Sequence, residues 1–295
     1  KNITNKPTVV VIGDSFVEAS QVSNNDSFHG LLSKKFPLIN IYPIGTSGDS
    51  LSQYLAYAKF AKEKFNPDKF IFTIIENDFD ESWLRFKSAA SAHYFDDEGT
   101  LTRIDYKPSI LGIIARNSVV FRYLFIDVHL PWRVSVLLQN VKKLTSKKKK
   151  DTVTISAQDN KEINEKLLSY SIKSIDIFLK ELSNIVEGKP VLLVVDGDRR
   201  TIYKNIPNGN DYNKRDYDSL PEKAKWKNQV YDYLINKIIL PKNVNLIDMH
   251  PIFLENWKKN AKKFDFYNDY HWNEYAHNIV AEAISDTLFF NYNTK

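Results

Sequence analysis

A chain of 295 residues that is 43% hydrophobic and 13% aromatic has enough apolar side chains for a full core, which excludes a disordered protein. Its net charge of +5 falls to −1 without the six lysines of residues 142–150, so the basicity is local and nucleic acid is excluded as the main partner. The absence of cysteine excludes disulfides, a thiol nucleophile and cysteine-ligated zinc.

Short apolar runs rich in β-branched residues mark the predicted strands, at residues 8–12, 39–42, 69–75, 191–195 and 244–247. The runs are continuous rather than alternating, which indicates strands that are covered on both faces. Helical patterns lie between them, most clearly at 51–65 and 274–288, where Asn273 is the predicted N-cap of the last helix. Alternating strands and helices predict a three-layer α/β/α fold with about five parallel strands.

Far more chain separates the third and fourth strands than one crossover helix needs. Residues 84 to about 165 are therefore predicted to be a large helical insertion in a single domain of residues 1–295. Its early part is rich in aromatic residues and arginine and its late part in lysine, which favours a lid or a partner surface. The apolar stretch 109–139 contains too many charges to span a bilayer.

Chemically useful side chains follow the strands at their carboxyl ends, where the sites of open parallel sheets form. The tripeptide Gly-Asp-Ser occurs twice, and its first serine, Ser15, directly follows the first strand. Asn77 follows the third strand, and Asp269 and His271 stand just before the last helix. In an extended segment residues i and i+2 face the same side, so this carboxylate can orient this imidazole.

These residue types fit acyl transfer. A serine hydroxyl needs a base within hydrogen-bond reach, and the base needs a third group to fix its tautomer, which Ser15, His271 and Asp269 supply. Asn77, with backbone N–H groups at Ser15 and a nearby glycine, would stabilise the oxyanion. This chemistry needs no cofactor, and the scattered aspartates and histidines lack the spacing of a metal site.

The segments "GDSF", "TSGDS", "ND" and "DYHWN" occur in the order of the four sequence blocks of the SGNH or GDSL hydrolase family, which the chain resembles over residues 8–80 and 190–290. The resemblance implies that Ser15 is the nucleophile and His271 the base, oriented by Asp269. It also implies an oxyanion hole formed by Ser15, Gly48 and Asn77. Ser50, in the second Gly-Asp-Ser, is then the predicted N-cap of the helix at 51.

Two positions depart from the family pattern. Ile75 stands where the third block usually has glycine, and one residue rather than two separates Asp269 from His271. The shorter D-x-H-W form resembles the alginate O-acetyltransferases of the same superfamily. This resemblance implies an O-acetyltransferase or O-acetylesterase that acts on a bacterial envelope or extracellular polysaccharide.

The expected partners are an acylated or acyl-accepting carbohydrate and a membrane-bound acyl donor protein. We expect a location in the cell envelope, periplasmic or extracellular. Because the chain begins at Lys1 rather than at methionine, we also expect that a signal peptide, membrane anchor or preceding domain was removed.

Several alternatives stay open. Trp272 and Tyr270 are either core residues or a platform for a sugar, and Arg199 either binds an anionic or carbohydrate ligand or lies in a solvated loop. Asp269 could instead cap the last helix. Asp14 and Asp78 are expected to be structural, as are the histidines other than His271, with His250 the most site-like: His29, His93, His129, His250 and His277.

Two other functions compete with catalysis. A non-catalytic glycan-binding or assembly subunit could retain the same fold. A flavodoxin-type nucleotide-binding protein would also use the strand ends, but the loop after the first strand lacks the glycine run of a phosphate cradle.

Overall fold

The computed structural model of the chain describes residues 6–107, 113, 117–123, 157–204, 225–267 and 269–290. It divides into two compact units, Lys1–Ile104 with Lys161–Lys295, and Asp105–Asn160. In the second unit the structure describes helix α5 (Val119–Arg122). His129, the lysine run 142–150 and half of the predicted insertion lie outside the described residues.

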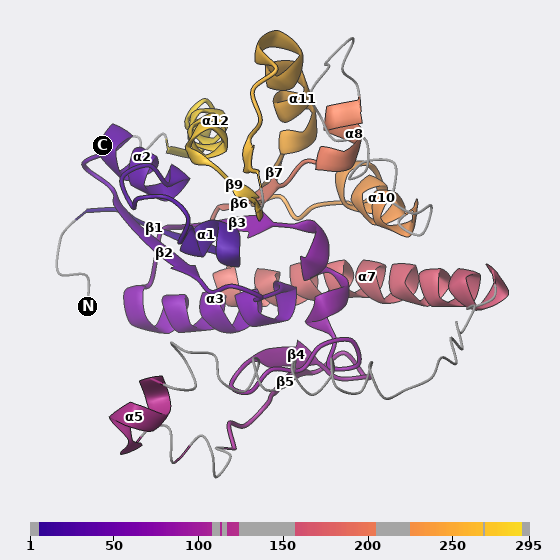
Figure 1. Cartoon of the computed structure of the whole chain (residues 1–295). Coiled ribbons are helices and arrows are strands. Elements are labelled where there is room, and N and C mark those ends of the chain that lie inside the picture. Colours follow the sequence, from indigo (N-terminus) through magenta and orange to yellow (C-terminus); the bar gives the residue numbers. More distant parts are fainter. Residues whose placement is uncertain are drawn as a thin grey trace. The chain divides into compact units, whose positions relative to one another are not determined.

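The first unit is built on a five-stranded sheet of order β2-β1-β3-β6-β7, in which every neighbouring pair is parallel (Figure 1). This confirms the predicted sheet. The strands are β1 (Thr8–Gly13), β2 (Asn40–Gly45), β3 (Lys69–Ile74), β6 (Val191–Val195) and β7 (Val244–Asp248). Strand β2 extends past its predicted end and stays paired with β1 up to the register Gly13↔Gly45.

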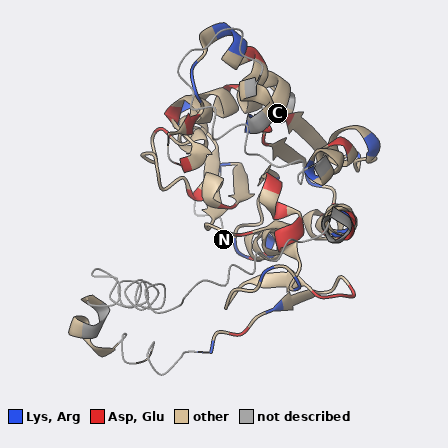
Figure 2. Ribbon diagram, turned by 45° about the vertical axis from the view of Figure 1, so that its right-hand side comes forward, with Lys and Arg blue, Asp and Glu red and all other residues tan. Residues whose placement is uncertain are grey.

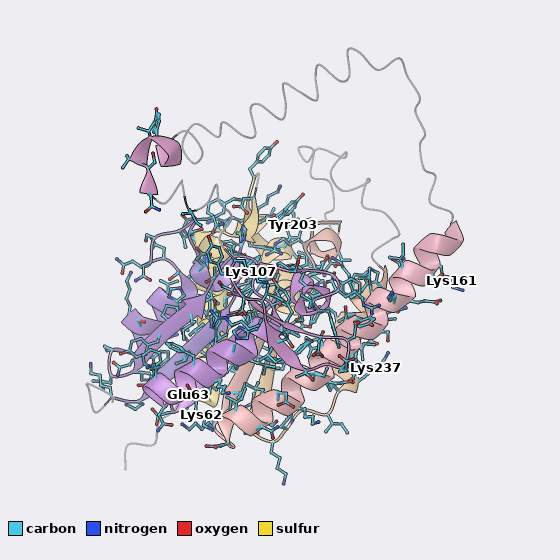
Figure 3. All side chains as sticks on the ribbon, turned by 90° about the horizontal axis from the view of Figure 1, so that it is seen from below. Lys62, Glu63, Lys107, Lys161, Tyr203 and Lys237 are labelled. Carbon is cyan, nitrogen blue, oxygen red and sulfur yellow. The ribbon has the colours of Figure 1, made fainter. Side chains whose placement is uncertain are left out.

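Helices cover both faces of this sheet, so the fold is the predicted three-layer α/β/α arrangement (Figure 1). One face carries α3 (Leu51–Phe65), α7 (Ala157–Val186) and α10 (Lys225–Asp232), with α3 and α7 side by side (Figure 3). The other carries α1 (Ser15–Glu18), α2 (Phe28–Lys35), α8 (Arg199–Lys204), α11 (Met249–Asn260) and α12 (Glu274–Ser285).

Alternation along each strand explains the continuous apolar runs. Val10 and Ile12 pack into the core under α3 and α7, whereas Val9 and Val11 pack into the core under α2 and α12. Because successive side chains of a strand point to opposite faces, both sets must be apolar when both faces are covered.

Short elements complete the first unit around the ends of the strands. They are the one-turn helices η1 (Glu76–Asp78), η2 (Asp80–Ser82) and η6 (Leu288–Phe290), the π-helix η5 (Tyr233–Lys237), and two antiparallel hairpins, β4 (His93–Phe95) with β5 (Leu101–Arg103) and β8 (Asp265–Phe266) with β9 (Asp269–Trp272).

The first of these hairpins lies within the residues predicted as an insertion, 84–165. Ser52 Oγ donates to the His93 carbonyl at 2.8 Å, and the His93 N–H donates to Gln53 Oε1 at 2.8 Å, so β4 is fastened to α3. The first unit runs to Ile104 and resumes at Lys161, and the single domain with an insertion at 84–165 stays a prediction. Sequence alone gave no sign of this short hairpin.

Charges of both signs are spread over the described ribbon of the first unit (Figure 2). No helix in the described ranges is long and apolar enough to cross a membrane.

Candidate active site

The turn after β1 presents Ser15 at the start of α1. Asp14 is the N-cap of this short helix, and its Oδ1 accepts the Phe16 N–H at 3.0 Å. Ser15 Oγ donates to the second carboxylate oxygen of Asp14 at 3.4 Å, and Ser15 is 7% exposed. The structural role expected for Asp14 is therefore confirmed, and the serine is held at the carboxyl edge of the sheet.

Asp14 is buried at this turn, and burial raises its pKa to about 6, although the Phe16 N–H and the charge of His271 act in the opposite direction. An aspartate in the unfolded chain has a pKa near 3.8. The folded protein therefore binds the proton more tightly, and stability is lost as the pH rises through this window.

Replacing Asp14 with asparagine should therefore stabilise the protein above pH 6. The amide still caps α1 but carries no buried charge, so the gain in unfolding free energy should be small at pH 4 and grow to about 3 kcal/mol by pH 7. Urea unfolding at both pH values measures it, with Asp286→Asn at an exposed position as the control. A gain that is the same at both pH values would contradict the assignment.

Strand β9 brings the base and its carboxylate together. His271 Nδ1 hydrogen-bonds Asp269 Oδ1, and the same oxygen accepts the His271 backbone N–H at 3.1 Å. Gln21 Nε2 donates to the other oxygen at 3.3 Å. Burial alone would raise the pKa of Asp269, but these hydrogen bonds lower it below its usual value. An imidazole whose Nδ1–H faces a carboxylate has Nε2 left to accept a proton.

The base lies beside the nucleophile turn. The rings of His271 and Phe16 pack with centroids 5.0 Å apart, and Phe16 directly follows Ser15. Within the described residues, the Ser15 hydroxyl donates its hydrogen bond to Asp14, whereas its predicted role as nucleophile needs a bond to His271 Nε2. Such bonds are often loose or absent before substrate binds.

Asp269 does not cap the last helix. Asn273 does so, with its Oδ1 accepting the Ala276 N–H at 3.1 Å, as predicted. Ser50 likewise occupies the N-cap position of α3, although its side chain makes no capping bond there.

The predicted oxyanion donors come from the two loops that flank this turn. A Cβ on Gly45, at the end of β2, would lie 2.7 Å from the Asp14 carbonyl, so the loop toward Gly48 starts against the nucleophile turn. Gly48 has a φ of +82°, which favours glycine. Among the described residues, no acceptor bonds the backbone N–H of Ser15 or Gly48.

The third donor, Asn77, lies in η1 beyond β3, and buried Asp78 shapes this turn. Asp78 Oδ2 accepts the Ile75 N–H at 2.8 Å and the Tyr54 hydroxyl at 2.9 Å, which confirms its expected role in steadying the Asn77 loop. Burial raises the pKa of Asp78 well above its usual value. Ile75 has a φ of −115°, which any residue adopts, and its side chain is buried. The isoleucine is therefore accommodated without distortion.

Trp272 corrects one interpretation of the sequence. It is 1% exposed, and its Nε1 donates to buried Asp196 at 3.0 Å. A sugar platform at Trp272 is therefore wrong, and the residue packs in the core. Tyr270 is 76% exposed, and its role toward a sugar stays a prediction.

Arg199 is not in a solvated loop. Its side chain is 15% exposed, its Nη1 donates to Asp196 at 2.7 Å, and its guanidinium lies 5.3 Å from the Phe16 ring centre. Burial raises the pKa of Asp196, and the charge of Arg199 opposes that rise. Ligand binding by Arg199 stays a prediction.

Three of the remaining histidines are packed, as expected. His29 contacts Ser27 Oγ and the Val17 carbonyl, both at 3.1 Å, and His93 contacts Gln53. Burial lowers the pKa of His277 to about 3. His250 differs, because its Nδ1 accepts the Asp198 N–H at 3.1 Å and it borders a cavity.

That cavity, of about 370 Å³, lies at the carboxyl ends of β6 and β7. The residues that line it include Asp196, Asp198, Thr201, Asn228, Tyr231 and His250, and most of the surface that they expose to it is apolar. Asp196, which lines the cavity, is also the acceptor for Trp272, the residue that follows the predicted base His271. We found no group of histidine, aspartate and glutamate suited to a metal ion in the part of the chain that the structure describes.

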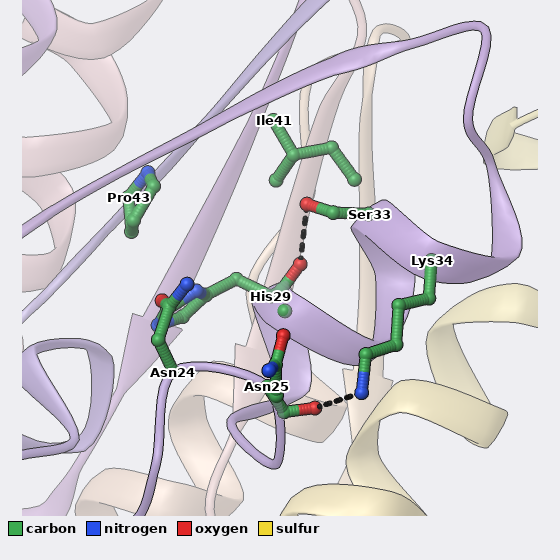
Figure 4. Close-up of a pocket in the computed structure, with 8 residues that line it drawn as sticks. Asn24, Asn25, His29, Ser33, Lys34, Ile41 and Pro43 are labelled. Atoms are coloured by element: carbon green, nitrogen blue, oxygen red, sulfur yellow. Dashed lines mark hydrogen bonds between the residues drawn. The ribbon is translucent and has the colours of Figure 1, made fainter.

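A second cavity, of about 250 Å³, lies between α2 and β2 (Figure 4). Its polar groups already bond one another: Ser33 Oγ donates to the His29 carbonyl at 2.8 Å, and Lys34 Nζ donates to the Asn25 carbonyl at 3.0 Å. These groups have partners without a ligand, so we assign no binding role to this cavity.

Sequence reasoning missed three residues that contact predicted site residues, Gln21, Glu81 and Lys87, and also Glu18, which contacts Ser47 beside Gly48. Glu81 lies four residues after Asn77, and this spacing was the one sequence signal that could have indicated a contact. The other three, in α1 and in two turns, meet the site only through paths that the fold defines.

No family model matches the sequence, and no curated protein matches it. Solved structures do match. A member of the lipolytic protein G-D-S-L family from Veillonella parvula is 10% identical, with a TM-score of 0.45 and coverage of 96% of this chain and 99% of that one. TesA is 14% identical, with a TM-score of 0.46 and coverage of 95% and 97%.

A two-domain esterase active on acetylated mannans is 11% identical, with a TM-score of 0.44 and coverage of 95% of this chain and 48% of that one.

Proposed function

We propose that this chain is a serine-dependent acyl ester enzyme that acts on O-acetyl groups of a carbohydrate through an acyl-serine intermediate. The observation that carries the proposal is the Asp269 carboxylate on His271 Nδ1, with the imidazole packed on the residue that follows Ser15. This geometry holds the base in the tautomer that accepts a proton at Nε2.

In the first half of the reaction, Ser15 Oγ bonds to the acyl carbon while its proton moves to His271 Nε2. The carbonyl electrons move onto oxygen, where the N–H groups of Ser15, Gly48 and Asn77 stabilise the charge. Collapse of this intermediate re-forms the carbonyl and breaks the bond to the sugar oxygen, which takes the proton from His271. The acetyl group is left on Ser15.

In the second half, a water or a sugar hydroxyl attacks the acyl-serine and gives its proton to His271. Ser15 leaves and recovers that proton, and the acetyl group departs as acetate or as a new ester. Hydrolysis and transfer share the intermediate and differ in which nucleophile reaches it. The D-x-H-W block, with its likeness to alginate O-acetyltransferases, favours transfer.

The choice of a carbohydrate as the substrate rests on the resemblance of the D-x-H-W block to the alginate O-acetyltransferases. The cavity at the ends of β6 and β7 offers hydroxyl, amide and imidazole groups that can hydrogen-bond sugar hydroxyls, and most of the surface exposed in it is apolar. Tyr270, exposed beside the base, adds an aromatic face for a sugar ring. The membrane-bound acyl donor and the location in the cell envelope are part of this proposal and rest on the motif alone.

A non-catalytic glycan-binding subunit is the second candidate. The chain departs from the family pattern at Ile75 and in the shorter spacing between Asp269 and His271. These departures would favour a binding subunit if they displaced Asn77 or His271. Instead, Ile75 has ordinary backbone geometry, and the shorter spacing forms the carboxylate–imidazole bond directly.

Covalent labelling separates the two candidates. A serine-directed fluorophosphonate should modify the protein once, at Ser15, and an aryl acetate should be hydrolysed. Peptide mapping locates the label, and Ser15→Ala should abolish it. A protein that binds acetylated glycan but neither reacts with the fluorophosphonate nor turns over the ester would favour the binding subunit.

A further inference from the structure

A continuous chain of contacts joins the two loops that carry the predicted oxyanion donors. Lys87 Nζ donates to the Gly48 carbonyl at 2.6 Å and also bonds the Glu81 carboxylate. The same Glu81 oxygen accepts Asn77 Nδ2 at 3.2 Å. The order of contacts is therefore Gly48, Lys87, Glu81, Asn77, and it spans three separate turns of the chain.

We propose that Lys87 and Glu81 are positioning residues that hold the Gly48 N–H and the Asn77 amide in the orientation needed to stabilise an oxyanion. The inference rests on the proposed function, because it concerns the same site. Neither residue is assigned a contact with substrate, and each acts through the donor that it bonds.

Glu81 decides which end of the Asn77 amide is available. An ionised carboxylate only accepts hydrogen bonds, so the amide atom facing it must be the nitrogen. One N–H of that nitrogen is then used, and the second N–H of the same atom stays available to the oxyanion. Without Glu81 the amide can turn and present Oδ1, an acceptor that would repel the developing charge.

Lys87 acts on the other loop, which is fastened on both sides of Gly48. Before Gly48, the Ser47 N–H and hydroxyl both donate to Glu18 Oε2 at 2.6 Å. After it, the Asp49 N–H donates to the Thr46 carbonyl at 3.1 Å, and Lys87 holds the Gly48 carbonyl. Glu18 lies in α1, the helix that begins with Ser15, so the loop is tied to the nucleophile turn as well.

The Gly48 N–H is then a donor of this loop that is bonded to no acceptor within the described ranges. Its direction depends on the peptide planes around it. Preorganised donors stabilise an oxyanion well because they need no reorganisation during the reaction. Loss of Lys87 would let the Gly48 peptide rotate and would release Glu81 at the same time.

Steady-state kinetics on an aryl acetate test the proposal. Lys87→Met keeps most of the aliphatic stem but removes both contacts, and Glu81→Ala removes the acceptor for Asn77. We expect each to lower kcat by roughly 10- to 100-fold with KM changed less than about threefold, because only the transition state carries the oxyanion. Lys87→Arg retains donors for both partners and should recover most of the loss.

A double-mutant cycle distinguishes positioning from a general structural role. If Glu81 acts through Asn77, Glu81→Ala should cost far less kcat in an Asn77→Ala background than in the wild type. Lys227→Met is the matched control, because Lys227 forms a similarly half-buried ion pair with Glu76, the neighbour of Asn77, yet bonds no predicted donor. Its kcat should stay within about twofold of the wild type.

Thermal unfolding of each variant checks that the fold is retained. The positioning role is overturned if kcat is unchanged in both Lys87→Met and Glu81→Ala, or if the effects of Glu81→Ala and Asn77→Ala on kcat are fully additive. In either case, labelling of Ser15 and turnover by the wild-type protein would still support the proposed function. A wild-type protein that neither labels at Ser15 nor turns over ester overturns the proposed function and this inference together.

Discussion

Ser15→Ala should lower turnover of an aryl acetate by roughly five to six orders of magnitude, as loss of the nucleophile does in other triad enzymes. The Ser15 hydroxyl is the group proposed to form the acyl-enzyme bond, and the neighbouring Asp14 carboxylate is engaged in capping α1 with its Oδ1. Stopped assays with the variant at high concentration measure the residual rate.

Ser50→Ala is the matched control, because Ser50 belongs to the second Gly-Asp-Ser. Its hydroxyl contacts Ser52 Oγ at 3.2 Å and the Glu81 carbonyl at 3.3 Å, and these contacts are structural. We expect activity near that of the wild type. An active Ser15→Ala protein together with an inactive Ser50→Ala protein would show that the nucleophile was assigned to the wrong tripeptide.

The central sheet was predictable because strands covered on both faces leave a strong apolar pattern. Strand β1 contains Val9 to Ile12 without a polar interruption, and β6 is apolar throughout. The end of β2 was harder to predict, since this edge strand is partly exposed and contains Pro43. Helix α3 has the bounds predicted for it, while α12 ends at Ser285, three residues before the predicted end.

The chemistry of individual site residues was predictable where sequence neighbours also meet in space. Asp269 and His271 are such a pair, because an extended strand puts i and i+2 on one side. Trp272 was ambiguous, since the same alternation allowed either the core or the open face. Whether the Trp272 side chain is buried depends on what packs against β9, and here its indole contacts Phe16 and Asp196.

The contacts around Gly48 were not predictable. Lys87 lies 39 residues from Gly48 along the chain, and Gln21 lies 248 residues from Asp269. Contacts of this kind depend on how turns converge at one edge of the sheet, and no periodicity in the sequence encodes that convergence.

Asp269→Asn should lower turnover by up to roughly ten-thousandfold while leaving the fold intact, through the wrong tautomer of His271. The carboxylate now accepts from three donors: the His271 ring, the His271 backbone N–H and Gln21 Nε2. An asparagine has a single acceptor oxygen, so the amide can turn its NH₂ group toward Nδ1, which moves the ring proton to Nε2, where the base must be free. The cost should appear in kcat on an aryl acetate, with thermal unfolding close to that of the wild type because the side chain is 38% exposed.

Gln21→Ala removes one of the three donors without changing the carboxylate, and its kcat should fall by no more than about tenfold. If the Asp269→Asn enzyme keeps nearly full activity, Asp269 does not orient the base, and Ser15 and His271 must work with a different third group.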